Sequence, residues 1–270
     1  MGKKLNTRLI RKRKLSSGNA PLSMLTAYDY QTAQLLNSTN LDLILVGDSV
    51  GNVVLGYDTT VEVSLEEMIT FGAAVKRGAP EKFVVVDLPF GTYATKETGI
   101  KNSVELFQKT RAQALKLEGA SEVTLELVSM MTATGIPVMG HIGLTPQSVH
   151  EQGGYYTHGK SQSRGEQLTL EAKALQEAGC FAVVLECVDK ELAASITKSL
   201  EIPTIGIGSG DQTDGQVLVI NDLLMMGSET PPSFCRPIAN LFSIKKDLID
   251  EYLRKFECSN QDKELKPNVQ

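Results

Sequence analysis

Eight short apolar runs are the feature that most constrains how this chain folds. A helical pattern follows most of them, and their apolar character is continuous rather than alternating. Continuous runs are expected for parallel strands that are covered on both faces. Eight of them alternating with helices in 270 residues predict an α/β fold, a single (β/α)8 barrel, with an open doubly wound sheet as the alternative. The predicted strands are Leu22–Thr26, Leu43–Val46, Phe83–Val86, Ala114–Leu117, Pro137–Gly140, Ala182–Leu185, Thr204–Ile207 and Gln216–Ile220.

The segments between these runs carry helix signals. Ser64 and Glu67 have the spacing of a capping box, and Gly78 suits the C-terminal end of the same helix. Ser163 and Glu166 repeat the N-terminal pattern further along the chain. The predicted helices are Ser64–Gly78, Ser103–Ala114, Ser121–Gly135, Ser163–Gly179 and Asp189–Leu200.

Composition limits the class of protein. The net charge of −5 argues against broad nucleic-acid binding, and no apolar run is long enough for a membrane-spanning helix. The four cysteines have no paired spacing, which fits a reducing, cytoplasmic setting. We expect one domain over residues 1–270, with a basic and solvated N-terminal segment (about 1–20) and a polar tail (about 259–270).

Polar side chains stand at the carboxyl ends of five predicted strands, where (β/α)8 barrels build their active sites. Four carboxylates from four different strands would therefore meet at one rim. A lysine in the fourth strand, a serine after the second and a histidine at the end of the fifth would join them. These residues are Asp48, Ser49, Asp87, Lys116, Glu118, His141 and Glu186.

Carboxylates gathered at one rim need a counter-charge, because like charges raise one another's pKa and oppose burial. Lys116 is one such charge, and a divalent cation is a better one. Oxygen ligands without paired cysteine or histidine indicate Mg²⁺ or Mn²⁺ rather than Zn²⁺.

Glu186 differs from the other acids because it follows the apolar run FAVVL and precedes Cys187 and Val188. Apolar neighbours can raise a glutamate pKa towards neutral, which suits a general base, and His141 is the competing candidate. An acidic rim with Mg²⁺ as a Lewis acid fits a 2-oxo acid, whose adjacent C–H bond then becomes acidic. The residues alone thus predict enolate chemistry on an oxo acid.

Seven segments make a more specific resemblance. MLTAYDY, LILVGDSVGNVVLGYDTT, VVVDLPFGTY, ALKLEG, GIPVMGHIGLTPQSV, AGCFAVVLECV and IPTIGIGSG occur in order between about Thr7 and Leu224. They resemble the ketopantoate hydroxymethyltransferase family. The resemblance implies a barrel of the phosphoenolpyruvate/pyruvate superfamily. It also implies transfer of a hydroxymethyl group from 5,10-methylenetetrahydrofolate to 3-methyl-2-oxobutanoate, giving 2-dehydropantoate for pantothenate and coenzyme A biosynthesis.

The resemblance also assigns roles. It implies that Asp48, Asp87 and Glu118 form the Mg²⁺ site, and that Glu186 accepts the substrate proton to give a Mg²⁺-stabilised enolate. It implies a homo-oligomer, a decamer. The alternative function is a Mg²⁺-dependent carbon–carbon or carbon–phosphorus lyase of the same superfamily that acts on a 2-oxo acid. The side chains implied to contact the substrate are Asp48, Ser49, Asp87, Lys116 and His141.

Overall fold

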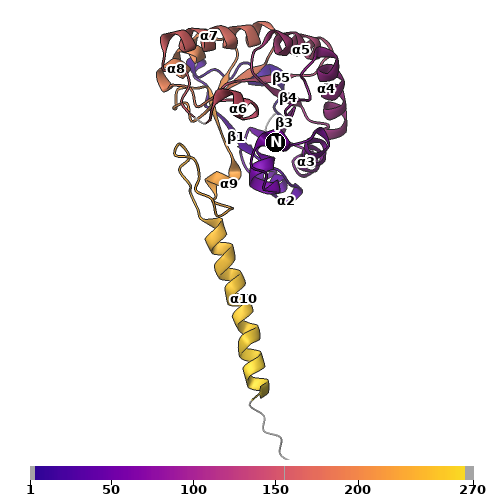
Figure 1. Cartoon of the computed structure of the whole chain (residues 1–270), viewed down its shortest axis with the longest axis vertical. Helices are drawn as coiled ribbons and strands as arrows, with labels where there is room; N and C mark the ends of the chain where they lie inside the picture. Colours follow the sequence, from indigo (N-terminus) through magenta and orange to yellow (C-terminus); the bar gives the residue numbers. More distant parts are fainter. Residues whose placement is uncertain (1–3, 155, 265–270) are drawn as a thin grey trace, which may run out of the picture. The chain divides into compact units, whose positions relative to one another are not determined.

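The computed structural model describes residues 4–154 and 156–264, and its contacts divide the chain into two compact units, 1–219 and 220–270. The first unit contains eight strands that close into one barrel in chain order (Figure 1). This confirms the predicted (β/α)8 architecture and rules out the open sheet. The prediction of a single domain over 1–270 stays a prediction. The strands are β1 (Leu22–Thr26), β2 (Leu43–Val46), β3 (Phe83–Asp87), β4 (Ala114–Glu118), β5 (Val138–Gly143), β6 (Ala182–Glu186), β7 (Thr204–Ile207) and β8 (Gly215–Leu218).

All eight strand pairs are parallel, including the closing pair of β1 with β8. The register brings polar residues side by side at the carboxyl ends of neighbouring strands. Asp87 on β3 pairs with Lys116 on β4. Glu118 on β4 pairs with His141 on β5, one step further along. The barrel therefore groups residues that are far apart in the sequence.

Helices follow most of the strands and cover the outside of the barrel (Figure 1). The larger ones are α2 (Tyr30–Asn37), α3 (Leu65–Gly78), α4 (Lys96–Thr110), α5 (Glu122–Ala133), α7 (Gln162–Glu177) and α8 (Lys190–Ser199). Short helices are α1 (Thr7–Ile10), α6 (Val149–Gln152) and α9 (Ile220–Leu223), with single turns at Leu15–Ser17, Gly51–Leu55, Thr60–Glu62 and Pro146–Ser148.

The helix starts test the capping predictions. At α3 the predicted capping box is present, with the Glu67 carboxylate accepting from the Ser64 backbone N–H at 2.7 Å. The start predicted at Ser163 is wrong, because Ser161 caps α7. Helix α4 also begins earlier than predicted, at Lys96, with Thr95 as its cap. In both cases a small hydroxyl residue nearer the preceding loop satisfies the free N–H groups.

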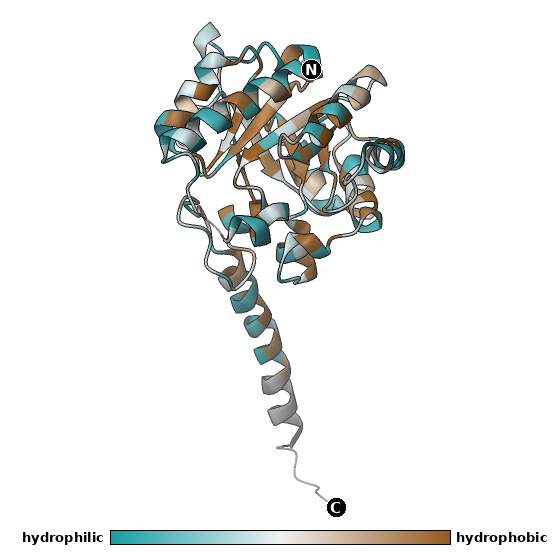
Figure 2. Cartoon of the chain, turned by 45° about the horizontal axis from the view of Figure 1, so that its top comes forward, coloured by the Kyte–Doolittle hydropathy of each residue, from teal (hydrophilic) through white to brown (hydrophobic). Residues whose placement is uncertain are grey.

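Apolar side chains line the strands, which are largely brown in the hydropathy colouring of Figure 2. The N-terminal segment belongs to this packing, because Ile10 is fully buried in the same cluster as Leu22 and Phe83. Lys14 is also buried, and its Nζ lies 2.6 Å from Asp214 Oδ2. The expectation that this segment is simply solvated is therefore wrong for Ile10 and Lys14.

The second unit consists of α9 and α10 (Leu241–Glu264) with their connecting loop. The polar tail predicted from Ser259 begins inside α10, and residues 265–270 lie outside the described residues. Within the described part of the chain, no helix is both long and apolar enough to cross a membrane.

Candidate active site

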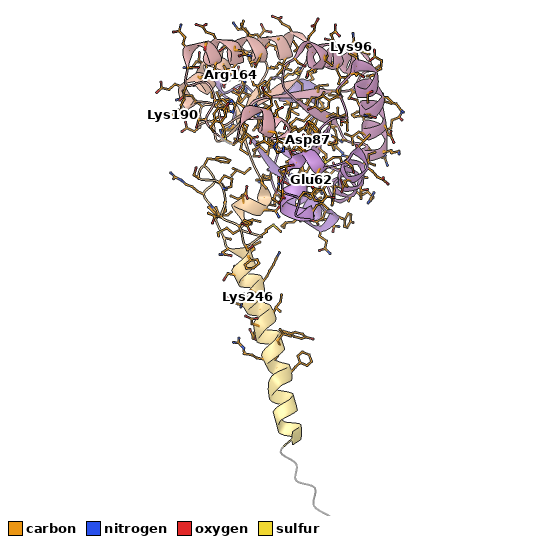
Figure 3. The ribbon with its side chains drawn as sticks, in the orientation of Figure 1. Glu62, Asp87, Lys96, Arg164, Lys190 and Lys246 are labelled. Carbon is orange, nitrogen blue, oxygen red and sulfur yellow. The ribbon has the colours of Figure 1, made fainter. Side chains whose placement is uncertain are left out.

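Three carboxylates are buried at the carboxyl ends of the strands. Asp87 and Glu118 are the last residues of β3 and β4, and Asp48 lies two residues beyond β2. Their exposed fractions are only 1%, 6% and 4%, respectively. The Asp87 carboxylate accepts a hydrogen bond from the Asp48 backbone N–H at 3.2 Å. Figure 3 labels Asp87 within the barrel. The predicted acids are thus brought together and removed from bulk solvent.

Lys116 is the cation nearest to these acids. Its Nζ lies 3.1 Å from Asp87 Oδ2 and 3.7 Å from Glu118 Oε1. The same atom lies 3.2 Å from His141 Nδ1. Lys116 is 4% exposed, so its charge acts in a poorly hydrated setting where it is weakly screened.

His141 connects the acids to the proposed base. Its Nδ1 lies 3.3 Å from Glu118 Oε1, and its Nε2 lies 3.2 Å from Glu186 Oε2. Both are ion-pair distances without hydrogen-bond alignment. Glu186 ends β6, and its side chain is 17% exposed, more than the other site acids. Glu186 is therefore both within reach of His141 and partly accessible.

These side chains line one small cavity of about 90 Å³, together with Ser49, whose Oγ lies 2.8 Å from the Tyr28 hydroxyl oxygen. Every site residue predicted from the sequence borders this cavity. Its remaining walls are mainly apolar and come from Leu45, Pro146, Val184, Ile207, Val217 and Val219. The cavity thus offers an apolar wall beside a charged one, which suits a compact organic acid.

Gln147 is a site residue that the sequence analysis missed. Its Nε2 donates to Asp48 Oδ2 at 2.8 Å, and its backbone N–H donates to Glu118 Oε2 at 3.1 Å. Its Oε1 accepts from the Tyr93 hydroxyl at 2.6 Å. It is neutral and lies in the loop after β5, so a pattern of charged residues at strand ends does not include it. The one sequence signal nearby was Pro146, a residue that favours the first position of a helical turn.

The electrostatics of the cavity reflect burial and crowding. Burial, and then the charges of Glu118 and Asp87, raise the pKa of Asp48 well above its usual value. Burial also raises the pKa of Asp87. Burial and Lys116 act to lower the pKa of His141, but contacts with Glu118 and Glu186 outweigh them and raise it to about 9. The neighbouring acids, with Asp87 foremost, raise the pKa of Lys116 against the opposing effect of burial.

The donor atoms around this cavity are suited to a metal ion that keeps part of its water shell. Among the described residues, no three histidine, cysteine or carboxylate side chains are close enough to form a complete metal site by themselves. However, Asp87 Oδ1 is buried and has no hydrogen-bond partner in the described chain, and three acids face one lysine. Mg²⁺ commonly takes only one or two protein carboxylates and completes its shell with water and substrate. The donor set fits that mode.

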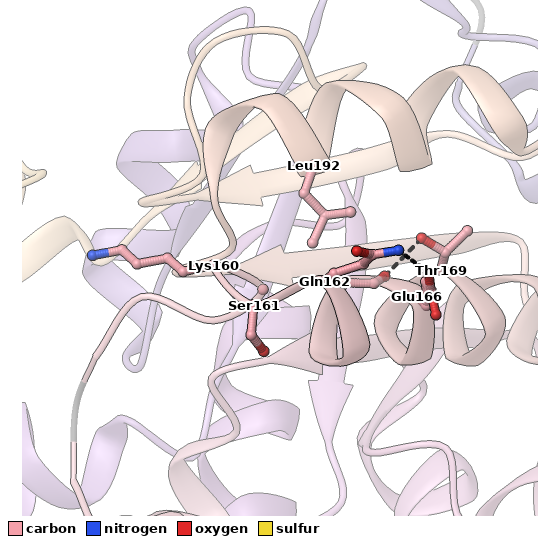
Figure 4. A pocket seen from close by; sticks show the side chains of 8 residues that line it. Lys160, Ser161, Gln162, Glu166, Thr169 and Leu192 are labelled. Carbon is pink, nitrogen blue, oxygen red and sulfur yellow. Dashed lines mark hydrogen bonds between the residues drawn. The ribbon is translucent and has the colours of Figure 1, made fainter.

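Two further cavities lie near this end of the chain's strands. One, of about 410 Å³, is lined by Glu118, which also borders the small cavity, and by its hydrogen-bond partner Gln147. It extends to Phe90, Ser121 and Val123. The other has a similar volume and is lined by α7, α8 and the segment before α7, including Gln162, Glu166 and Leu192 (Figure 4). None of the predicted site residues lines the second one. Only the first adjoins the acids.

Fold and site together define a (β/α)8 barrel with a buried cluster of charged side chains at the carboxyl ends of its strands. The model of the family described as ketopantoate hydroxymethyltransferase matches residues 4–260. The chain belongs to this family and is a transferase.

Two relatives support this family assignment. The 3-methyl-2-oxobutanoate hydroxymethyltransferase of Geobacillus sp. (strain WCH70) is 48% identical over 84% of this chain and 82% of its own length. Its counterpart in Coxiella burnetii (strain CbuK_Q154) is 44% identical over 91% of this chain and 92% of its own.

Solved structures support the fold at low identity. A 2,3-dimethylmalate lyase, described as a PEP mutase/isocitrate lyase superfamily member, aligns with a TM-score of 0.61 and 13% identity over 99% of this chain and 91% of its own. A phosphonopyruvate hydrolase complex with oxalate and Mg²⁺ aligns with a TM-score of 0.60 and 11% identity over 94% and 99%. These alignments support the (β/α)8 fold, and the lyase alternative is not favoured.

Proposed function

We propose that this chain transfers a hydroxymethyl group from 5,10-methylenetetrahydrofolate to 3-methyl-2-oxobutanoate, giving 2-dehydropantoate for pantothenate biosynthesis. The observation that carries the proposal is the small cavity, where Glu186, His141, three acids and Lys116 form a charged wall beside an apolar one. The apolar wall matches the isopropyl group of the oxo acid, and the charged wall matches its oxo and carboxylate groups.

Asp48 and Asp87 would hold a Mg²⁺ ion, with Glu118 as the third acid of the site. When bound, Mg²⁺ supplies Lewis-acid polarisation of the substrate keto group. The unpartnered Oδ1 of Asp87 supports this assignment. Lys116 and Ser49 bind the substrate's oxygens through their Nζ and Oγ atoms.

Glu186 acts as the general base and takes the proton from C3 of the oxo acid. Water adds to the one-carbon unit, whose two bonds to folate nitrogens break; the nitrogens take up the protons of the water, and tetrahydrofolate leaves a carbon unit at the level of formaldehyde. The electron pair left at C3 then forms the new bond to this carbon, and its oxygen takes up the proton removed from C3 to become the hydroxyl group of the product. His141, whose pKa is raised to about 9, is protonated at neutral pH and places a positive charge 3.2 Å from Glu186 Oε2.

The folate would approach through the cavity lined by Phe90, Ser121 and Val123, which adjoins Glu118 and Gln147. Its volume of about 410 Å³ lies within the range of small-molecule sites. Phe90 is 49% exposed there and offers an aromatic face for stacking of a flat heterocycle.

Exchange of the C3 proton for deuterium, with no folate present, tests the first half of the reaction. We expect wild-type exchange to need Mg²⁺, and we expect Glu186→Gln to slow it at least 100-fold, the lower range for general-base catalysis. Glu177→Gln, on the exposed end of α7, is the matched control and should exchange normally. Undiminished exchange in Glu186→Gln would remove Glu186 from the base role.

Calorimetry of oxo-acid binding tests the metal assignment. We expect wild-type binding to strengthen when Mg²⁺ is added, and we expect Asp87→Asn to lose this dependence. Equal Mg²⁺ dependence in both proteins would contradict the assignment of Asp87 as a ligand.

We also propose that the chain works in the cytoplasm and assembles with copies of itself, a decamer by analogy with its family. The free thiols of Cys180, Cys187 and Cys235 suit a reducing compartment. Exposed apolar side chains along α10 support an assembled state, because such a row is usually covered. They are Phe242, Ile244, Leu248, Ile249, Tyr252, Leu253 and Phe256. Light scattering of the purified protein measures the oligomeric state.

A further inference from the structure

A second polar cavity lies at the opposite ends of the strands from the proposed active site. It has a volume of about 600 Å³. Pro80 lies just before β3 and Gln113 just before β4, so the cavity faces the amino ends of these strands. The acids of the active site stand at their carboxyl ends. The reaction proposed above assigns no role to this cavity.

Five of the nine residues that line the cavity are cations, and none is an acid. Lys76 and Arg77 come from the last turn of α3, Lys109 from the last turn of α4, and Arg111 caps α4. Lys4 of the N-terminal segment completes the set. This is an unusual concentration of positive charge for a chain with a net charge of −5.

Two of these cations have a carboxylate partner within 4.0 Å in the described part of the chain. Lys4 Nζ lies 3.5 Å from Glu81 Oε1, and Lys109 Nζ lies 2.7 Å from Glu105 Oε1. Among the described residues, the side chains of the other three have no carboxylate within 4.0 Å. These are Lys76, Arg77 and Arg111. Their mutual repulsion is therefore only partly compensated within the chain.

Helix C-termini favour cations, so a few basic residues at the ends of α3 and α4 are expected without any ligand. Two observations go beyond that explanation. The charges of two helices and of Lys4 converge on one concave volume. In addition, Arg111 has φ of 58°, a left-handed conformation in which glycine is the usual helix cap. Arg111 therefore occupies a position whose backbone conformation favours glycine over arginine.

Lys76 reports the same crowding. Burial, and then the nearby charge of Lys4, lower the pKa of Lys76 to about 8. A bound anion would offset both effects, because it would attract the ammonium group and replace part of its lost hydration.

We propose that this cavity is a binding site for a small phosphate-bearing anion, such as an organic phosphate or diphosphate. The guanidinium groups of Arg77 and Arg111 bind phosphate oxygens in bidentate fashion, and Lys76 contributes a point charge. A volume of about 600 Å³ exceeds that of one phosphate group and leaves space for the organic part of the ligand. This proposal is independent of the transfer reaction proposed above.

Calorimetric titration of the full chain with inorganic pyrophosphate tests the proposal. The buffer is free of metal, so that pyrophosphate cannot bind through Mg²⁺ in the active site. We expect saturable binding with a stoichiometry of one per chain, and a fall in affinity as ionic strength rises. We expect Arg77→Ala and Arg111→Gly each to weaken binding at least tenfold. The proposal would be overturned if saturable binding were absent. It would also be overturned if both variants bound pyrophosphate as tightly as the wild type.

Two features keep this test decisive. Arg111→Gly removes the guanidinium where the backbone already suits glycine, so the variant should fold, and its thermal midpoint should not fall. Lys198→Ala removes a cation from the last turn of α8, away from the cavity, and should bind pyrophosphate like the wild type. A similar loss of affinity in Lys198→Ala would mean that binding follows the net charge of the chain rather than this cavity, and it would overturn the proposal. Binding of citrate as tight as that of pyrophosphate would overturn the assignment to phosphates.

Discussion

Gln147 organises two of the acids on which the proposed chemistry depends. It donates one hydrogen bond to Asp48 through its amide and one to Glu118 through its backbone. We expect Gln147→Leu to lower kcat/KM by about 10- to 100-fold, the usual cost of removing a residue that orients metal-site ligands. The lost amide leaves Asp48 with one fewer hydrogen bond in a site where its pKa is already raised. Steady-state kinetics at several Mg²⁺ concentrations measure the effect.

The kinetics also separate positioning from general damage. Loss of orientation should raise the Mg²⁺ concentration needed for half-maximal rate, whereas loss of fold would lower the amount of active enzyme alone. Gln162→Leu, an exposed glutamine at the start of α7, is the control and should keep wild-type kinetics. An unchanged Mg²⁺ requirement in Gln147→Leu would contradict the positioning role.

Lys76 allows a prediction about pH. Its pKa falls from 10.5 to about 8 on folding, so its protonated form is disfavoured in the native state. The native state is therefore penalised below pH 8, and the penalty disappears as the pH rises through the unfolded pKa near 10.5. We expect Lys76→Met to raise the free energy of unfolding at pH 7 by about 1 kcal/mol or less, because the group is only half buried and solvent screens it.

Urea denaturation at pH 7 and pH 10.5 measures this difference. The advantage of Lys76→Met over the wild type should shrink at the higher pH. An advantage that is equal at both values would mean that the gain comes from packing rather than from charge.

The site residues divide into those that the sequence could predict and those that it could not. Asp87 and Glu118 were predictable because an acid that ends an apolar run must lie at the rim of a barrel. Gln147 was not, because the position of a loop residue depends on which strand ends it contacts in three dimensions. Its partner Asp48 is 99 residues away in the chain.

At the scale of elements, the end of β5 and the end of β6 are held together through Gly143. Its φ is +98°, and a Cβ on it would lie 2.2 Å from the Glu186 backbone oxygen. We expect Gly143→Ala to displace the end of β6 and, with it, the Glu186 carboxylate. Activity should fall at least tenfold, because a misplacement of about 1 Å can cost about 100-fold. The C3 deuterium-exchange assay measures this loss directly.

Gly135 provides the matched control at the end of α5. Its φ is +92°, but nothing lies within 4 Å of where a Cβ would be. Gly135→Ala therefore carries the backbone strain, about 1 kcal/mol, without the collision. It should keep normal exchange. Normal exchange in Gly143→Ala would show that β6 tolerates the shift.

The strands and helices were not equally predictable. The strand β2 was placed correctly at Leu43–Val46, because a parallel strand buried on both faces begins and ends with its apolar run. The start of α4 was missed by seven residues, since its first turn, from Lys96, is polar and only Thr95 marks it. Helix boundaries of this kind depend on local hydrogen bonds that several nearby hydroxyl residues could make.

At the scale of the whole barrel, an ion pair joins the N-terminal segment to the residue that directly precedes β8. Lys14 Nζ contacts Asp214 Oδ2 at 2.6 Å and also donates to the Thr197 carbonyl at 2.7 Å. Asp214 accepts from the backbone N–H of Leu15 at 2.8 Å and of Thr204 at 2.9 Å. This pair could not be predicted from sequence, because 200 residues separate its members.

We expect Lys14→Met to lower the free energy of unfolding by about 3–5 kcal/mol, because it leaves the buried Asp214 carboxylate without its cation. Lys96→Met is the matched control. Lys96, labelled in Figure 3, lies on the barrel unit. It pairs with Glu126 at 2.7 Å, but the two side chains are 42% and 47% exposed, so the loss should be below about 1 kcal/mol. Urea denaturation measures both.

In a double-mutant cycle, adding Asp214→Asn to Lys14→Met should cost far less than Asp214→Asn costs the wild type, since the uncompensated charge is then removed. Equal costs in the two backgrounds would mean that the two residues stabilise the barrel separately, and that Ile10 rather than the ion pair holds the segment in place.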